Sequence, residues 1–135
     1  MIVADTNIIA YLYLEGEWST QVEKLLEKDA QWAAPLLWRS EFRNVLALYI
    51  RKRNLSLEQA QQIMQEAMLL LQGREYEIVS SHVLALVAAS GCSAYDCEFV
   101  ALAQDLGISL VTVDKNILKE FPQIAVSLDD YLANG

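Results

Sequence analysis

The sequence has little of what builds zinc sites, disulfide frameworks or thiol catalysis. Its 135 residues include two cysteines, Cys92 and Cys97, and one histidine, His82. These three side chains cannot complete a four-ligand zinc site without carboxylates, and we interpret both cysteines as small buried apolar residues of a reducing compartment. His82, which follows two serines, is typical of a surface or capping position at a helix start. A disulfide and a Cys-His nucleophilic pair stay open as alternatives.

The chain also lacks an apolar run long enough to span a membrane, and its first residues lack the basic start of a signal peptide. We therefore expect a cytoplasmic protein, folded as one domain over residues 1–135. Hydrophobic residues make up 54% of the sequence. This fraction is high for a small domain and indicates apolar surface that a partner buries.

The stretch that organises the rest of the chain is 1–7. Ile2, Val3 and Ala4 form a short apolar run typical of a strand buried on both faces of a parallel sheet. Asp5 ends that run, and the residues after Asn7 have the apolar spacing of a helix. Because open α/β sheets bind ligands at the carboxyl ends of their strands, Asp5 is expected at the floor of a crevice.

Strands and helices alternate along the remaining sequence. We expect further strands at 31–34, 76–79, 108–113 and 124–126, with helices between them, including long ones over 36–53 and 93–106. A capping box at 56–59 marks one helix start, and Gly107 fits the position after a helix end. The pattern predicts an α/β fold, a three-layer α/β/α sandwich around a mainly parallel sheet with right-handed crossovers.

Two acids occupy helix rows that are otherwise apolar. Glu41 shares its row with Leu37, Val45 and Leu48. Asp96 shares its row with Phe99, Val100 and Ala103, whereas Glu98 and Asp105 lie on a row that can face water. Because an isolated buried charge is costly to desolvate, a cation between the two inward acids explains them better than chance.

Two further acids, Asp5 and Asp114, end predicted strands. If those strands are neighbours, all four carboxylates meet within a few ångströms at one edge of the sheet. Oxygen donors without histidine or thiolate suit Mg²⁺ or Mn²⁺. The structural alternatives are that Asp5 and Asp114 are helix N-caps, that Asp96 favours its helix dipole, and that Glu41 pairs with a nearby arginine.

Four short motifs follow one another in the chain: Asp5-Thr6-Asn7, Ser40-Glu41, Tyr95-Asp96 and the Leu-Val-Thr-Val-Asp run that ends at Asp114. In kind, order and spacing they resemble the motif set of the PIN-domain ribonucleases, most of all the toxin-like VapC type. The resemblance covers nearly the whole chain. It implies an α/β/α sandwich and a Mg²⁺- or Mn²⁺-dependent endoribonuclease that leaves a 5′-phosphate and a 3′-hydroxyl.

The resemblance also implies residue roles and partners. Asp5, Glu41, Asp96 and Asp114 correspond to the catalytic metal ligands, with Thr6, Asn7 and Thr112 as supporting polar groups. Toxin-like members commonly pair with a small antitoxin, and many are homodimers. We expect both here, because the apolar excess includes residue types favoured at interface cores, namely Trp18, Trp32, Trp38, Tyr49 and Met68. Internal packing is the alternative for each of these side chains.

Two features depart from the family pattern. Some members carry a further acid just beyond the last aspartate, where this chain has Lys115 and Asn116. The net charge of −8 is also poorly suited to binding a polyanion such as RNA. A candidate RNA track is the basic set in the predicted helix 36–53, which consists of Arg39, Arg43, Arg51, Lys52 and Arg53. The alternative for Arg51, Lys52 and Arg53 is a solvated helix face.

Other classes of protein fit the acids less well. A receiver-type phosphoacceptor domain would have paired acids after its first strand and an aspartate after its third, where this chain has Thr6, Asn7, Ser80 and Ser81. A haloacid-dehalogenase-type phosphatase would have an aspartate in place of Asn7. A PIN domain that acts only as a binding module would be expected to lack one of the four acids. A PIN nuclease outside toxin-antitoxin systems, engaged in RNA processing, shares the same motifs.

Overall fold

Most of the strands form from short apolar runs that stop at a polar or turn residue. The computed structural model describes residues 1–134. Within that range it contains the strands β1 (Ile2–Ala4), β2 (Trp32–Pro35), β3 (Glu75–Tyr76), β4 (Leu110–Thr112) and β5 (Ala125–Ser127). They pair in the order β3-β2-β1-β4-β5, and every pairing is parallel. The strands that precede Asp5 and Asp114 are therefore neighbours at the centre of the sheet.

Helices connect the strands and begin at capping side chains in several cases. They are α1 (Thr6–Tyr13), α2 (Ser19–Lys28), α3 (Leu37–Arg51), α4 (Leu57–Leu70), α5 (Ser80–Ala88), α6 (Ala94–Leu106), α7 (Lys115–Glu120) and α8 (Leu128–Ala133). The capping box of α4 is formed as the sequence predicts, with Ser56 and Gln59 exchanging hydrogen bonds. Gly107 follows α6 with a φ of 65°, a left-handed conformation that glycine adopts without steric cost.

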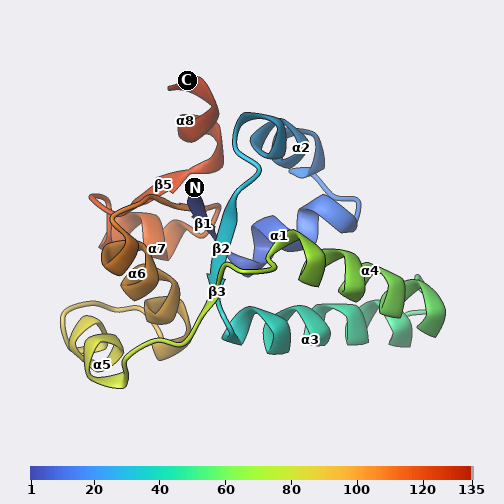
Figure 1. Cartoon of the computed structure of the whole chain (residues 1–135), viewed down its shortest axis with the longest axis horizontal. Helices are drawn as coiled ribbons and strands as arrows, with labels where there is room; N and C mark the ends of the chain where they lie inside the picture. Colours follow the sequence, from blue (N-terminus) through green and yellow to red (C-terminus); the bar gives the residue numbers. More distant parts are fainter. Residues whose placement is uncertain (135) are drawn as a thin grey trace.

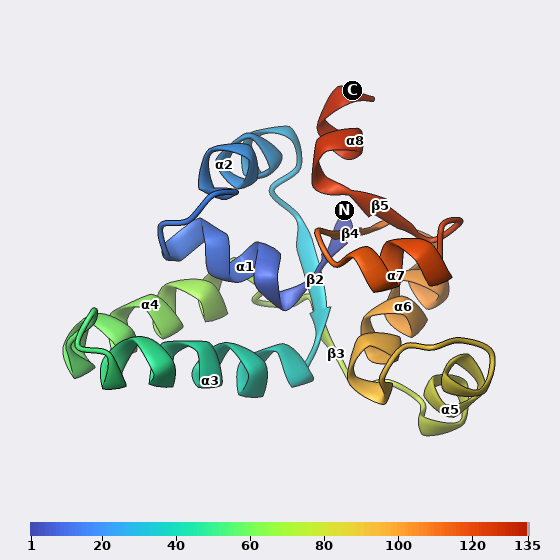
Figure 2. The ribbon, with the colours of Figure 1, turned by 180° about the vertical axis from the view of Figure 1, so that it is seen from behind.

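The helices cover both faces of the sheet, so the predicted three-layer α/β/α fold with a parallel sheet is confirmed. Figure 1 shows the sheet nearly edge-on, with α5, α6 and α7 on one side and α1 to α4 on the other. The view from behind in Figure 2 shows α3 and α4 running together beyond the sheet as an arm. This arrangement leaves the first turns of α1, α3 and α6 near the carboxyl edge of the sheet.

The core lies between the sheet and these helices, and the tryptophans divide between core and periphery. Trp32 and Trp38 are completely buried, so these two side chains pack internally and offer nothing to a partner. Trp18, Tyr49 and Met68 are partly buried. Among residues 1–134, no helix is long and apolar enough to cross a membrane.

Candidate active site

Asp5 is held at the junction of β1 and α1 by two hydrogen bonds. Its Oδ1 accepts from the backbone N–H of Thr6 at 2.8 Å, which caps α1. Its Oδ2 accepts from the hydroxyl of Thr112 at 2.7 Å. Burial, the largest influence, raises the pKa of Asp5 to about 6, while these two hydrogen bonds oppose the rise and the charges of Asp96 and Glu41 add to it. The hydrogen bonds therefore fix the carboxylate in place, while burial and the neighbouring acids disfavour its charged form.

Thr112 connects the ends of the two central strands. Its buried hydroxyl donates to Asp5 and accepts from the backbone N–H of Asp114 at 3.0 Å. Asp114 in turn caps α7, because its Oδ1 accepts from the N–H groups of Asn116 and Ile117 at 2.8 and 3.1 Å. The capping alternative is therefore true of both strand-ending aspartates. A capping aspartate still has a second carboxylate oxygen, so a cap does not exclude a second role.

Glu41 and Asp96 approach the same edge from two helices. Glu41 Oε1 accepts from the hydroxyl of Thr6 at 2.7 Å, which ties α3 to the start of α1. Asp96 lies in the first turn of α6, where its N–H donates to the capping Ser93 Oγ. Burial raises the pKa of both carboxyls, and like charge raises them further, from Asp96 at Glu41 and from Asp114 at Asp96.

The four acids line one cavity of about 260 Å³ together with Thr6, Asn7, Asn44 and Val45. None of these eight lining side chains is basic, so within the described chain the cavity has no cationic partner of its own. Carboxylate, hydroxyl and amide oxygens without a basic neighbour are a donor set that fits a hard divalent cation. The acids do not yet surround one point, since no three His, Cys, Asp or Glu side chains among residues 1–134 are arranged as a ready ion site. Their closer approach around an ion stays a prediction.

The row that carries Glu41 is not a core row. The buried residues of α3 are Trp38, Phe42 and Leu46, one position further along the chain, whereas Leu48 on the row of Glu41 is 47% exposed. The apolar stripe of α3 is wide, and its margin forms the wall of a cleft. Glu41 is half-buried for this reason.

Sequence reasoning missed one residue of the cavity lining and misplaced an acid near it. Asn44 lines the cavity from α3. Its spacing of three from Glu41 places both on one helix face, which was the available signal. Glu98, expected to face water, is half-buried, and the pKa of its carboxyl is raised by burial and by Glu41. The charge of Glu41 on α3 therefore reaches Glu98 on α6, a relation between distant segments that the helix period alone does not reveal.

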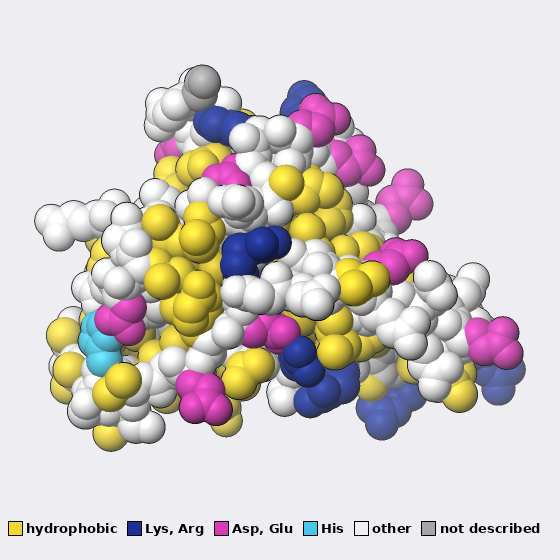
Figure 3. All heavy atoms as spheres, in the orientation of Figure 1, with side chains coloured by type: hydrophobic (Ala, Val, Ile, Leu, Met, Phe, Trp, Pro, Cys, Tyr) yellow, Lys and Arg dark blue, Asp and Glu magenta, His cyan; other side chains and the backbone are white. Residues whose placement is uncertain are grey.

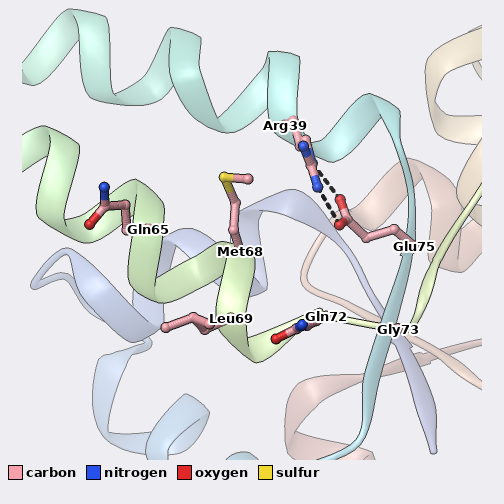
Figure 4. Close-up of a pocket in the computed structure, with 7 residues that line it drawn as sticks. All are labelled: Arg39, Gln65, Met68, Leu69, Gln72, Gly73 and Glu75. Carbon is pink, nitrogen blue, oxygen red and sulfur yellow. Dashed lines mark hydrogen bonds and ion pairs between the residues drawn. The ribbon is translucent and has the colours of Figure 1, made fainter.

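The predicted basic track divides into two environments. Arg39 forms a two-pronged ion pair with Glu75, with its Nε and Nη2 each 2.6 Å from a carboxylate oxygen, and Trp38 Nε1 donates to the same carboxylate at 2.8 Å. Figure 4 shows this pair at a cavity of about 520 Å³ between α3, α4 and β3, lined also by Met68 and Leu69. That cavity is larger than the acid cavity, but its charges are already matched.

The other basic residues of α3 point outward. Arg43 is exposed and donates a hydrogen bond to the hydroxyl of Ser40. Arg51, Lys52 and Arg53 are exposed at the end of the helix. Figure 3 shows Lys and Arg side chains gathered along the lower edge of the molecule, where α3 runs. Since a helix rises about 1.5 Å per residue, the cluster at the end of α3 lies roughly 15 Å from Glu41.

The cysteines and the histidine lie outside the acid cavity. Cys92 and Cys97 are both buried and both free, which agrees with their interpretation as packing residues. His82 is at the start of α5, with Nε2 2.7 Å from Gln104 Oε1 and Nδ1 3.2 Å from Asp105. These contacts join α5 to α6.

Comparisons with known proteins agree with the geometry. The family profile of the PIN domain matches residues 2–124. Ribonuclease VapC3 of Pyrobaculum aerophilum is 29% identical over 126 residues, which cover 91% of this chain and 96% of that protein. The crystal structure of PAE2754 from the same organism superposes with a TM-score of 0.77 at 19% identity, covering 98% of this chain and 94% of that one. A toxin-antitoxin complex from Klebsiella pneumoniae gives 0.71 at 20% identity, covering 95% and 98%.

Proposed function

This chain belongs to the PIN-domain family, and from that premise we propose that it is a divalent-cation-dependent endoribonuclease, the toxin of a toxin-antitoxin pair. One observation carries the proposal. Asp5, Glu41, Asp96 and Asp114 line one cavity whose lining residues include no basic side chain. Because such a cluster repels itself, it is best explained as the ligand set of a cation. The similarity to a ribonuclease VapC3 supports RNA hydrolysis as the reaction class.

The residues of the chain have distinct roles in this proposal. Asp5, Glu41, Asp96 and Asp114 would hold the ion, which when bound supplies water activation and stabilisation of the charge that builds on phosphate oxygens. Thr112 and Thr6 orient Asp5 and Glu41 through hydrogen bonds of 2.7 Å each. With a pKa of about 6, Asp5 is mostly ionised at pH 7 and above, and is then able to bind a cation. The exposed amides of Asn7 and Asn44 can donate to RNA phosphate oxygens.

The RNA approaches along α3 in this proposal. Arg43 and the cluster Arg51, Lys52 and Arg53 offer exposed positive charge on the arm, at increasing distance from the acids. Arg39 remains part of the proposed track, but its charge is shared with Glu75, so its contribution to RNA binding is expected to be smaller.

Two kinds of protein partner complete the proposal. Large hydrophobic side chains remain exposed on several helices and loops: Leu36, Leu48, Leu57, Leu69, Val79, Leu84 and Tyr95. They support a homodimer and a further contact with a small antitoxin, as in the toxin-antitoxin complex that shares this fold. Light scattering tests the dimer, and a strict monomer from micromolar to near-millimolar concentration contradicts it.

The function is tested by incubating the purified protein with end-labelled RNA in EDTA, Mg²⁺ or Mn²⁺. We expect cleavage only with a divalent cation, to products with a 5′-phosphate and a 3′-hydroxyl. The protein encoded by an adjacent small open reading frame should co-purify and suppress that cleavage. Cleavage that persists undiminished in EDTA contradicts the cation-dependent mechanism.

A further inference from the structure

A second cavity adjoins the acids between α1 and α3. It measures about 160 Å³ and is lined by Asn7, Ala10, Tyr11, Leu14, Val45 and Tyr49. Asn7 and Val45 also line the acid cavity, so the two cavities meet at these side chains. The helices that form it, α1 and α3, lie side by side (Figures 1 and 2). A group bound here is therefore next to whatever binds at the acids.

The lining of this tyrosine cavity suits a flat aromatic group with a polar edge. Two tyrosines from different helices line it together with aliphatic side chains, and Asn7 lies where it adjoins the acid cavity. None of the six lining side chains is charged. Aromatic side chains stack unpaired nucleobases in single-stranded RNA, and an amide can pair with a base edge.

The ring of Tyr11 packs against Gly16, in the turn between α1 and α2. A Cβ atom added at Gly16 would lie 3.0 Å from Cε1 and 3.1 Å from Cδ1 of this ring, so the ring lies against the glycine backbone. Tyr11 and Tyr49 are both partly buried against the core. A surface that is ordered before binding loses less conformational entropy when a ligand arrives.

The size of the cavity limits its occupant. It is smaller than the roughly 300–1,000 Å³ of pockets that enclose a whole drug-sized ligand, and so fits one ring system rather than a folded segment. An apolar side chain of a protein partner is the competing occupant. The tyrosine pair, the amide and the direct continuity with the acids favour a nucleobase.

We propose that the tyrosine cavity receives one unpaired nucleobase of the RNA, from a nucleotide next to the phosphate that is cut. This inference rests on the proposed ribonuclease function. It also offers a reason why a chain with a net charge of −8 can bind RNA. Stacking needs no positive charge, so it adds affinity that salt does not screen, in contrast to contacts with phosphates.

The test measures binding of a fluorescent single-stranded oligoribonucleotide by anisotropy, in the Asp96→Asn background so that the RNA stays intact. Removing both rings in Tyr11→Ala/Tyr49→Ala should weaken binding by about tenfold to a hundredfold, with an unchanged salt dependence. Tyr11→Phe/Tyr49→Phe keeps the rings and should bind as the parent does. Tyr131→Ala, which truncates a partly buried tyrosine on α8, is the matched control and should also bind normally.

An abasic scan of the same oligonucleotide identifies the occupant. One abasic position should weaken binding to the parent by the same factor as the loss of the rings, and should cause no further loss in the Tyr→Ala double variant. If that variant does not fold by circular dichroism, Tyr11→Leu/Tyr49→Leu keeps apolar volume without a stacking face and gives the same expectation. Equal abasic losses with and without the rings, or unchanged affinity in the folded variants, overturn the inference.

The outcomes for this inference and for the proposed function are separate. If the wild type cuts RNA but the abasic losses do not depend on the rings, only the base-binding inference fails. If the wild type cuts no RNA with Mg²⁺ or Mn²⁺ but the abasic losses do depend on the rings, the cavity binds a base and the proposed catalysis fails.

Discussion

Two of the charged residues on helix α3, Arg39 and Glu41, have surroundings that differ completely. Arg39 meets Glu75 in a two-pronged ion pair, and the hydrogen bonds from Arg39 and Trp38 lower the pKa of Glu75. Glu41 accepts a hydrogen bond from Thr6 and shares a cavity with three other carboxylates, and burial together with the charge of Asp96 raises its pKa. The two sites are two residues apart in sequence, yet one has balanced charge and the other does not.

The comparison shows that charge balance, rather than cavity size, identifies the site that needs a ligand. The cavity beside Arg39 and Glu75 has about 520 Å³, twice the 260 Å³ of the acid cavity. Its charged groups nevertheless satisfy each other and need nothing from outside the chain. The acids retain a repulsion that folding alone does not relieve, which is typical of sites shaped for function.

The largest expected effect is on catalysis. Asp5→Asn or Asp96→Asn should reduce RNA cleavage by orders of magnitude with little loss of folding, because each change keeps volume but removes a charge that the cation needs. Asp105→Asn, at an exposed acid on the same helix as Asp96, is the matched control and should cleave normally. Glu98→Gln would be a poor control, since Glu98 is half-buried and the charge of Glu41 affects it. Full activity in both Asp5→Asn and Asp96→Asn rules out the assigned ligands.

The two sites should respond to pH with opposite sign. The folded protein holds the Asp5 proton up to a pKa of about 6, against 3.8 ordinarily, so unfolding releases it between these values. Stability of the cation-free protein therefore falls as pH rises through that window, by about 3 kcal/mol. The lowered pKa of Glu75 has the opposite effect on stability. Its stabilising contribution is present above the ordinary pKa of 4.5 and is lost as pH falls below that value. Urea unfolding in EDTA measures the free energy of unfolding at each pH. In Asp5→Asn, the decrease of this free energy above pH 4 should be smaller than in the wild type.

The same chemical change at Glu75 and Glu41 should alter stability in opposite directions. Glu75→Gln leaves Arg39 without its ionic partner and should destabilise the fold by about 1–2 kcal/mol, limited because the Arg39 side chain is 35% exposed. Glu41→Gln removes like-charge repulsion and should stabilise the cation-free protein. Thermal unfolding in EDTA at pH 8 compares them. Equal signs for the two variants would mean that the acid cluster is not under electrostatic strain.

The smallest expected effect concerns the basic track. Replacing Arg43, Arg51, Lys52 and Arg53 by Gln should weaken RNA binding modestly and reduce the slope of affinity against salt, with cation binding unchanged. Arg39→Gln should change that slope less, because its charge is already shared with Glu75. A salt slope that is identical in wild type and quadruple variant places the RNA elsewhere on the surface.

Local patterns predict local structure well in this chain. The apolar run before Asp5, the Ser56 capping box and Gly107 each carry a steric or hydrogen-bonding rule within a few residues, and each forms as expected. The strand predicted at 76–79 is instead the two-residue β3 (Glu75–Tyr76), because its extent depends on pairing with the distant β2. Helix α8 was not predicted, because its stability depends on packing against α2.

The four acids that line the cavity were also predicted from the sequence, because strand ends and helix rows place them at one edge. Thr6 and Thr112 were expected as supporting groups only through the family resemblance, and their particular hydrogen bonds, to Glu41 and to Asp5, were not predicted. Arg39 pairs with Glu75 rather than with Glu41. These contacts join residues far apart in sequence, so no helix or strand period encodes them.

Diffraction from Mn²⁺-soaked crystals, measured near the manganese absorption edge, tests the central claim most directly. The claim is that the unbalanced carboxylates form a cation site. We expect an anomalous peak in the acid cavity, about 2.0–2.3 Å from oxygens of Asp5 and of at least one of Glu41, Asp96 and Asp114, and no peak at the balanced pair of Arg39 and Glu75. Ordered carboxylates with no peak between them, at saturating Mn²⁺, would contradict the account.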